Sequence, residues 1–283
     1  MKKSIYYLMI MFILSACDSS NEEIKMKFNE VECQKNWAMC LEFPDKEYTI
    51  NRLDKPKKVA ILDSGINDKH PALRGQIVAK YNVINKSKYT KDIYGHGTSI
   101  AGIIAAKQND ETVQGINPLI EIYDVKVIDD QGGGEVSHVI EGIKWSMDKK
   151  VDLINISFGF KQDVPELRKV VDEAIERGII IIASAGNNYG LNLDFPARYE
   201  NVISVGSINK KLESSSFNSI GEIDIFAPGE GILVFQNDNK AVLEDGSSLA
   251  TAYVTGVLSL NSILKHNKQI KKENRINVIT YYR

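Results

Sequence analysis

Apolar runs recur along the chain between residues 59 and 207, and they constrain the fold more than any other feature of the sequence. A strand with one face in water alternates polar and apolar residues, whereas these runs are apolar throughout. They therefore predict strands of a parallel sheet that is buried on both faces. The runs are residues 59–66, 120–128, 151–157, 178–186 and 201–207.

Amphipathic segments lie between some of these runs. Residues 136–147 and 163–178 each place apolar side chains on one helical face, and Gly178 ends the second pattern. Asp163 and Glu166 have the spacing of a capping box at the start of that helix. Strands that alternate with helices predict a doubly wound α/β fold, with a mostly parallel sheet and helices on both faces. No internal repeat or second linker is present, so we expect a single domain over residues 57–283.

The N-terminus has the layout of a secretory signal. Two lysines precede an apolar run over residues 5–14, which is too short to span a bilayer, and small residues follow. Residues 14–17, Leu-Ser-Ala-Cys, resemble a bacterial lipobox. We therefore expect residues 1–16 to be removed and Cys17 to carry a lipid that anchors the protein to the outer face of a bacterial membrane. The alternative is an ordinary secretory peptide that happens to contain a cysteine.

Residues 17–56 are polar, charged and only weakly periodic, which is typical of a tether followed by a short lead-in to the domain. Cys33 and Cys40 lie in this segment, on either side of Trp37. In an oxidising compartment this pair can close a small disulfide loop, although two free thiols remain open from the spacing alone. No histidine lies near them, so we expect no zinc site there.

The overall charge argues against nucleic-acid binding. Lys and Arg number 35 against 37 Asp and Glu, for a net charge of −2, and no basic block is present. A chain of this kind lacks the positive surface that nucleic-acid binders present to phosphates.

Residues of reactive types stand where the predicted strands end and the predicted helices begin. Asp63 closes the first run, His96 precedes an apolar segment, Asn187 follows the fourth run, and Ser248 precedes the small-residue run 249–256. Each has a structural alternative, since Ser248 can be a helix cap and the others can serve turns or packing. In proteins with parallel sheets, active and binding sites lie beyond the carboxyl ends of the strands. Together, the four residues can supply a nucleophile, a base, an orienting carboxylate and an oxyanion donor.

These residues fall in short blocks whose order and spacing are characteristic. The four positions are separated by 33, 91 and 61 residues. The blocks are AILDSGI, GHGTSIAG, DVKVIDDQGGGEVSHVIEGIKW, INISFG, SAGN, FPARYENVISVGS, FAPG and GSSLATAYVTG. From about residue 57 to residue 267 the chain thus resembles the subtilisin-like serine proteases, the subtilases of peptidase family S8.

The resemblance implies a role for each residue. Ser248 would attack the scissile carbonyl, His96 would act as base and then as acid, and Asp63 would hold the imidazole. Asn187 and the backbone N–H of Ser248 would bind the oxyanion. No cofactor is required for such catalysis, and no catalytic metal is expected. His70 also matches a family position, where packing near the Asp63 turn is the expected role.

The same resemblance implies where a substrate binds. Gly132, Gly133 and Gly134, together with Ser157, Phe158 and Gly159, match the two segments that pair with an extended peptide. Asp194 falls near the base of the primary specificity pocket, where a carboxylate favours Lys or Arg on the acyl side of the scissile bond. The alternative for Asp194 is a solvated loop position. We expect a monomer whose partners are peptide or protein substrates.

The chain departs from the family at two places. Ala252 and Tyr253 stand where Pro and His are usual, which predicts altered packing of the helix after Ser248. Residues 107–113 keep the length of the family's strong calcium loop, with Asn109 at one ligand position, but Ala72 replaces an expected aspartate. Because calcium binding gains from charged oxygen ligands, a structural calcium ion is doubtful.

Small size, the Ser-Leu-Ala-Thr-Ala sequence after residue 247 and an expected basic specificity together resemble the leader peptidases that mature lanthipeptide bacteriocins. Such an enzyme would cut exported precursor peptides. Two alternatives remain open, a general surface-anchored subtilase and a binding lipoprotein that keeps the fold without turnover. The intact catalytic blocks argue against the second.

Overall fold

The computed structural model describes residues 23–27, 29–43, 45–51, 55–107, 114–238 and 240–260. The predictions for Cys17, the signal peptide and Asn109 fall outside these residues. Within them, none of the helices combines the length and apolar character that a membrane crossing requires.

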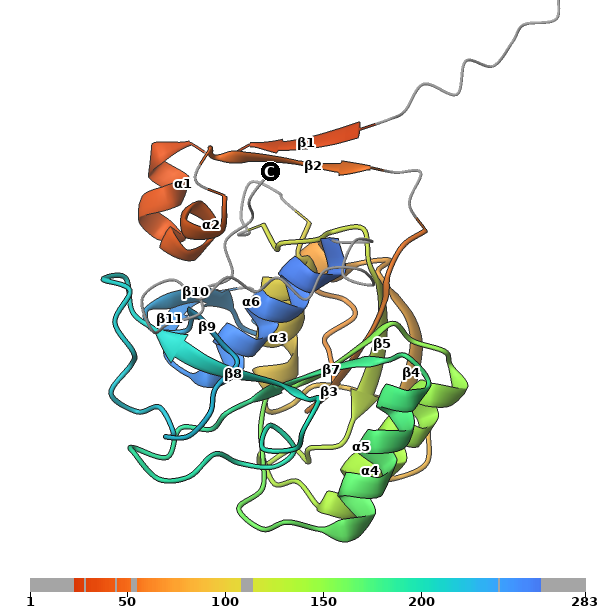
Figure 1. Ribbon diagram of the computed structural model, residues 1–283. Helices are drawn as coiled ribbons and strands as arrows, with labels where there is room; N and C mark the ends of the chain where they lie inside the picture. The colour runs from red at the N-terminus through yellow and green to blue at the C-terminus, as the bar shows by residue number, and fades with distance from the viewer. Residues whose placement is uncertain are drawn as a thin grey trace, which may run out of the picture.

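A sheet of seven parallel strands forms the centre of the molecule (Figure 1), which confirms the predicted fold class. Its order is β4-β5-β3-β6-β7-β8-β9. Five of the strands lie within the apolar runs or overlap them almost completely. The strands are β3 (Lys58–Asp63), β4 (Ile77–Asn82), β5 (Glu121–Lys126), β6 (Leu153–Ile156), β7 (Ile180–Ser184), β8 (Ile203–Ile208) and β9 (Ile225–Pro228).

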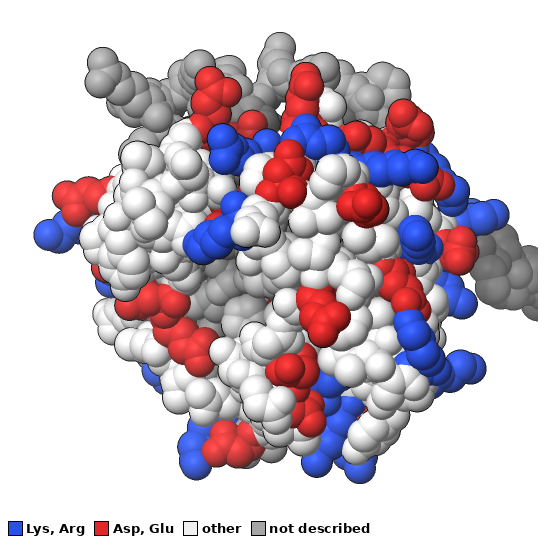
Figure 2. Space-filling model, turned by 90° about the horizontal axis from the view of Figure 1, so that it is seen from below, with Lys and Arg blue, Asp and Glu red and all other residues white. Residues whose placement is uncertain are grey.

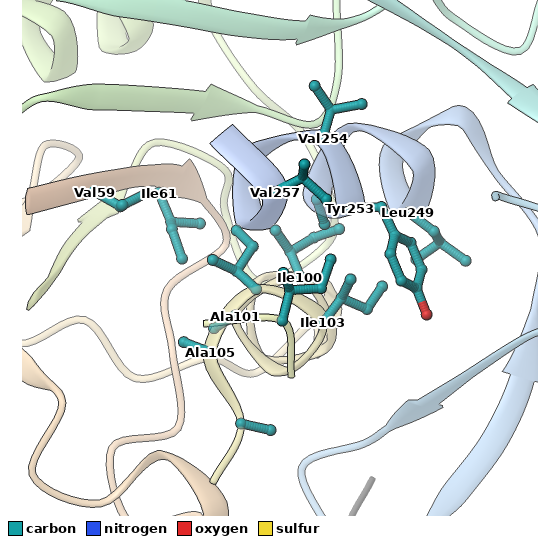
Figure 3. Packing of buried hydrophobic residues seen from close by; sticks show 14 of the residues in the cluster. Val59, Ile61, Ile100, Ala101, Ile103, Ala105, Leu249, Tyr253, Val254 and Val257 are labelled. Atoms are coloured by element: carbon teal, nitrogen blue, oxygen red, sulfur yellow. The ribbon is translucent and has the colours of Figure 1, made fainter. Parts of the chain in front are cut away.

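Helices cover the sheet on both faces (Figure 1). Helices α3 (His96–Ala105) and α6 (Ser247–Leu260) contribute to one hydrophobic core, and α4 (Val136–Asp148) and α5 (Pro165–Glu176) contribute to the other. Figure 3 shows α3 and α6 packed side by side, with Ile100 and Ile103 facing Tyr253 and Val257. This packing fixes the two helix starts that carry His96 and Ser248. The 3-10 turn η1 (Pro71–Leu73) lies before β4.

The predicted capping box of the helix at residue 163 is wrong. Helix α5 begins at Pro165 after Val164, and no side chain caps it. Asp163 instead accepts hydrogen bonds from Arg168 and from the hydroxyl of Tyr199, at 2.9 Å for the latter. A proline at the first helical position needs no N–H partner, so the carboxylate is free to bind elsewhere. The helix ends as predicted, with Gly178 at a φ of +83°.

The N-terminal segment, for which the sequence predicts a tether, is folded between residues 23 and 51. It contains β1 (Glu23–Lys27), α1 (Glu30–Lys35), α2 (Trp37–Glu42) and β2 (Glu47–Asn51), with β1 and β2 paired antiparallel. Cys33 and Cys40 form a disulfide whose Cα atoms are 5.5 Å apart. The segment folds because its few apolar side chains pack against the catalytic body, on the α3 and α6 side of the sheet.

A short hairpin completes the described chain. Strands β10 (Ile232–Phe235) and β11 (Ala241–Glu244) pair antiparallel just before α6. At its tip, Asn237 donates from Nδ2 to the carbonyl of Asp92, 3.0 Å away, and accepts from Thr98 Oγ1 at 3.0 Å. The hairpin therefore contacts the loop and helix that present His96.

Candidate active site

Four predicted residues lie at strand ends and helix starts of the sheet. Asp63 is the last residue of β3, and His96 is the first residue of α3. Asn187 follows β7 by three positions, and Ser248 is the second residue of α6. Because β3 and β7 are parallel strands of one sheet, their carboxyl ends lie along the same edge.

Asp63 and His96 are joined directly. The ring Nδ1 of His96 lies 2.8 Å from Oδ1 and 3.0 Å from Oδ2 of Asp63. The carboxylate is buried, with 1% of its side chain exposed, while 23% of the imidazole is exposed. The backbone N–H of Ser64 donates to the same Oδ1 at 2.8 Å. Asp63 is therefore fixed on its own strand, and it holds Nδ1 so that Nε2 is the free nitrogen.

The surroundings of His96 raise its pKa above the ordinary value of 6.5. Burial acts in the opposite direction and is the largest single influence. Attraction to the Asp63 carboxylate and the hydrogen bond to it outweigh burial, with smaller contributions from Glu244 and Asp92.

A buried network holds the His96 loop. Asp92 accepts from Ser64 Oγ at 2.9 Å and from the Gly95 N–H at 2.7 Å through Oδ1, and Oδ2 accepts from Thr98. Ser64 Oγ in turn accepts from the N–H of Gly97 at 2.9 Å. The start of α3 is thus tied to the residue after Asp63. The sequence analysis missed Asp92, although an aspartate four residues before His96 is visible in it.

Ser248 and Asn187 face the same small space beside Gly246. A Cβ built on Gly246 would lie 3.0 Å from Oγ of Ser248 and 3.5 Å from Nδ2 of Asn187. Oδ1 of Asn187 accepts from the N–H of Ser247 at 3.0 Å and from its Oγ at 2.7 Å. These bonds hold Oδ1 at Ser247 and leave Nδ2 beside Gly246, where Nδ2 makes no hydrogen bond to any described residue.

The two adjacent serines have different environments. Ser247 is fully buried, and its Oγ lies 2.6 Å from Oγ of Ser184 at the end of β7. Ser248 is only partly buried, and no hydrogen bond joins its Oγ to His96 or to another described side chain. Hydrogen bonds of this kind are often long in a protein without substrate and shorten when one binds. Ser247 thus positions Asn187, and Ser248 presents a free hydroxyl.

Ser157, Phe158 and Gly159 follow β6 and lie beside the Ser248 turn. Ser157 Oγ donates to the carbonyl of Ser248 at 3.2 Å and accepts from Asn155 at 2.8 Å. The glycine segment, Gly132 to Gly134, makes a turn in which the N–H of Gly133 donates to Oδ1 of Asp129 at 2.8 Å. This pairing uses part of the glycine backbone within its own turn.

Tyr94 lies against the glycine segment and was not among the predicted site residues. A Cβ on Gly132 would come within 2.6 Å of the Tyr94 ring, and Gly132 has a φ of +87°, so a side chain here would be strained and would push the ring aside. Tyr94 is 53% exposed, and its ring centroid lies 6.4 Å from that of His96. It forms an aromatic wall between His96 and Gly132. Gly134 forms an isolated bridge with Ile128.

Asp194 is buried between the segments that carry Ser157 and Asn187. A Cβ on Gly159 would lie 2.5 Å from Cβ of Asp194, and one on Gly186 would lie 2.4 Å from its Oδ2. Gly186 has a φ of +96°, in the left-handed region, so a side chain there would be strained as well. Asp194 therefore depends on these two glycines, and it is not a solvated loop residue.

Ala72, at the position where the family expects a calcium ligand, and His70 are both buried. Ala72 is fully buried and offers only a backbone carbonyl, which accepts from the N–H of Lys107 at 2.9 Å. Within the described residues, no group of three His, Cys, Asp or Glu side chains is placed to hold a metal ion. His70 is buried and stacks on Phe235 with ring centroids 4.2 Å apart. His138 lies on α4, outside the site.

Asp124 is a fully buried carboxyl on β5, next to Asp63's strand. Burial raises its pKa to about 8, although a hydrogen bond from Thr90 and the charge of Lys80 act against this rise. An unfolded aspartate titrates near 3.8, so the folded state holds an extra proton between that pH and about 8. Below pH 3.8 the carboxyl is protonated in both states and does not lower the free energy of unfolding. As the pH rises from 3.8 toward 8, the unfolded state ionises more easily than the folded state, so the free energy of unfolding falls.

We expect Asp124→Asn to stabilise the protein by about 2 kcal/mol or more at pH 9, and by less than about 0.5 kcal/mol at pH 3.5, because asparagine cannot ionise. Urea unfolding between these pH values checks this, in a Ser248→Ala background that prevents self-digestion. Asp148→Asn, at the exposed end of α4, is the matched control and should show no such trend. A stability difference that does not change with pH would contradict the interpretation.

Comparison with known proteins agrees with this geometry. The model of the subtilase family of peptidase S8 matches residues 54–274. The chain belongs to the subtilase family. An intracellular serine protease of Paenibacillus polymyxa is 38% identical over 213 residues, which are 72% of this chain and 65% of that protein. The major intracellular serine protease of Bacillus subtilis strain 168 is 37% identical over 214 residues, covering 72% of this chain and 67% of the relative.

Subtilisin E of Bacillus subtilis strain 168 is also 37% identical, over 208 residues that make up 72% of this chain and 54% of that protein. The chain thus spans about two thirds of the two intracellular relatives and about half of this subtilisin.

Proposed function

We propose that this subtilase is a serine endopeptidase that forms an acyl-enzyme on Ser248. The observation that carries the proposal is the buried Asp63 carboxylate, held 2.8 Å from Nδ1 of His96. The free Nδ2 donor of Asn187, which lies beside Gly246 as the Ser248 hydroxyl does, supports it. Carboxylate, imidazole, hydroxyl and amide are the groups that hydroxyl nucleophilic catalysis needs.

The mechanism follows from these positions. Oγ of Ser248 attacks the carbonyl carbon of the scissile bond while Nε2 of His96 takes the hydroxyl proton. The negative oxygen of the tetrahedral intermediate accepts hydrogen bonds from Nδ2 of Asn187 and from the backbone N–H of Ser248. The C–N bond then breaks, and His96 gives its proton to the departing amine. Water, activated by the same imidazole, attacks the ester, releases the acyl product and restores Ser248. No step requires a cofactor.

The substrate in this proposal is an extended peptide with Lys or Arg on the acyl side of the scissile bond. Support comes from the Asp194 carboxylate, which is buried between the Ser157–Gly159 and Asn187 segments. The face shown in Figure 2 is hollowed near its middle, and acidic side chains lie on several sides of the hollow, with a Lys or Arg side chain at one edge of it. Negative charge of this kind attracts basic peptides.

We place the reaction at the outer face of a bacterial membrane, with the enzyme anchored through Cys17. Its role there is to cleave exported precursor peptides, as the lanthipeptide leader peptidases do. The support for this role is the lipobox-like sequence, the serine block and Asp194. A general surface protease is the second candidate, since one relative, 34% identical over 227 residues, is the minor extracellular protease Epr of Bacillus subtilis strain 168.

The test is cleavage of matched peptides that differ only in Arg, Lys, Phe or Leu on the acyl side, using the fragment from Ser19 onward. We expect cleavage after Arg and Lys, loss of that preference in Asp194→Gly, and no cleavage by Ser248→Ala. Labelling by a serine-directed phosphonate should likewise disappear in Ser248→Ala. Cleavage after Phe or Leu would remove the basic specificity and favour the general protease, while an unlabelled but folded protein would point to a binding role.

A further inference from the structure

Lys161 binds the Asp194 carboxylate, although it lies 33 residues away in the sequence. Its Nζ is 3.0 Å from Oδ1 and 3.4 Å from Oδ2 of Asp194, and it also donates to Oδ1 of Asn188. Oδ1 of Asp194 also accepts a hydrogen bond from the amide Nδ2 of Asn188, at 2.9 Å. Lys161 is the cation that neutralises this carboxylate among the described residues.

The two partners of this ion pair differ in their freedom to move. Only 8% of the Asp194 side chain is exposed, and the close approach of Gly159 and Gly186 fixes it. In contrast, 68% of the Lys161 side chain is exposed. Lys161 follows Phe160, whose N–H and carbonyl both pair with Phe195, so its backbone is anchored while its side chain reaches over the rim. The lysine can therefore leave into solvent, and the aspartate cannot follow.

A substrate side chain that reaches Asp194 must take the place of this ammonium group. The exchange itself costs little, because the incoming cation keeps the buried carboxylate paired and water solvates the released lysine. A guanidinium group binds a carboxylate through two parallel hydrogen bonds, which an ammonium group cannot do. Arginine should therefore displace Lys161 more readily than lysine does, whereas an apolar side chain gains nothing by displacing it.

We propose that Lys161 is a specificity-determining residue, an internal competitor for the carboxylate that would otherwise bind a basic substrate side chain. The inference rests on the proposed function, because it assumes that Asp194 meets the acyl-side residue. Its consequences are specific. The free enzyme has no uncompensated buried charge at this point, lysine substrates are disfavoured relative to arginine substrates, and the preference for basic residues is weaker than Asp194 alone would give.

The experiment measures kcat/KM for four matched peptides with Arg, Lys, Leu or Phe on the acyl side. Lys161→Met keeps the length of the side chain and removes its charge, and it should raise the Arg-to-Leu ratio about three- to fivefold. Lys161→Arg supplies a stronger competitor and should lower that ratio about twofold or more. Lys169→Met, on the exposed surface of α5, is the matched control and should leave the ratio unchanged.

Repeating Lys161→Met in an Asp194→Asn background separates this inference from the proposed specificity. With no carboxylate to compete for, the substitution should no longer change the Arg-to-Leu ratio. If the wild-type enzyme prefers Arg through Asp194 but Lys161→Met leaves the ratio unchanged or lowers it, the competitor role is wrong and the specificity stands. If neither the wild type nor Lys161→Met favours Arg over Leu, both are wrong. A preference for Arg that emerges only in Lys161→Met supports the competitor role.

Discussion

Asparagine in place of Asp63 is expected to lower kcat about 10⁴-fold while the fold stays intact. The substitution keeps the size of the side chain and its place at the end of β3. It removes the negative charge that lies 2.8 Å from Nδ1 of His96. An amide that donates to Nδ1 would also favour the tautomer with the proton on Nε2, which cannot accept the Ser248 proton.

The pH dependence of the wild-type enzyme follows from the same pair. Asp63 raises the pKa of His96, and only the neutral imidazole can act as a base. The fold favours the protonated imidazolium of His96, which cannot accept the Ser248 proton. Activity should therefore fall as the pH is lowered through the raised pKa of His96, at a value above 6.5. Rate measurements with one peptide substrate from pH 5 to 9, on the wild type and on Asp63→Asn, give the kcat of the variant and the acidic limb of the wild-type pH profile.

Asp148→Asn is a suitable control for this substitution, because Asp148 is an exposed residue at the end of α4. It should retain wild-type kcat and the same pH limb. Circular dichroism of Asp63→Asn should match the wild type, which would exclude misfolding as the cause. A folded Asp63→Asn enzyme with more than about a tenth of wild-type kcat would be incompatible with an orienting role for Asp63.

The central sheet could be predicted from the sequence because most of its strands are buried on both faces. β3 and β6 are almost entirely buried, and their apolar runs follow directly from that burial. β4 was missed, since it lies at the sheet edge and all but one of its residues are at least partly exposed. β9 was also missed, since it lies at the other edge of the sheet and its sequence, Ile-Phe-Ala-Pro, ends in a proline that is untypical of a central strand.

Some residues of the site could likewise be predicted from the sequence, and others could not. Asp63, His96, Asn187 and Ser248 could be selected because each stands at a strand end or helix start within a recognisable block. Lys161 could not, since nothing in the sequence shows that the loop after β6 brings its ammonium group to a residue after β7. The N-terminal segment was also out of reach. Its apolar residues are too few to form their own core, and the surface that covers them comes from distant parts of the chain, among them helix α6 and the loop at Ile116.

Alanine in place of Phe43 is expected to destabilise the whole catalytic body by about 3–5 kcal/mol, which tests whether the N-terminal segment is part of the folded enzyme. Phe43 is 2% exposed and stacks on Tyr48 with ring centroids 4.0 Å apart. Both belong to the core that contains α3 and α6. The loss of the ring leaves a cavity in this shared core, so its cost should appear in the unfolding of the entire body.

Polar contacts join the same two parts. The hydroxyl of Tyr253, on α6, donates to Oδ1 of Asn36 at 2.9 Å, and Trp37 Nε1 donates to the carbonyl of Glu230 at 3.3 Å. The tyrosine at position 253, where the family usually has histidine, thus has a partner in the segment that precedes the domain. Loosening the segment should also loosen α6, the helix that presents Ser248.

Urea unfolding in the Ser248→Ala background measures the effect without self-digestion. The wild-type and Phe43→Ala proteins should each unfold in one transition, with the variant's midpoint shifted to lower urea. Tyr89→Ala provides the control, because Tyr89 is 66% exposed and its loss should change stability by less than about 0.5 kcal/mol. If Phe43→Ala melts the segment alone and the main transition stays in place, residues 23–51 are a separable attachment. A shared transition means that α6, and with it Ser248, depends on this segment for its position.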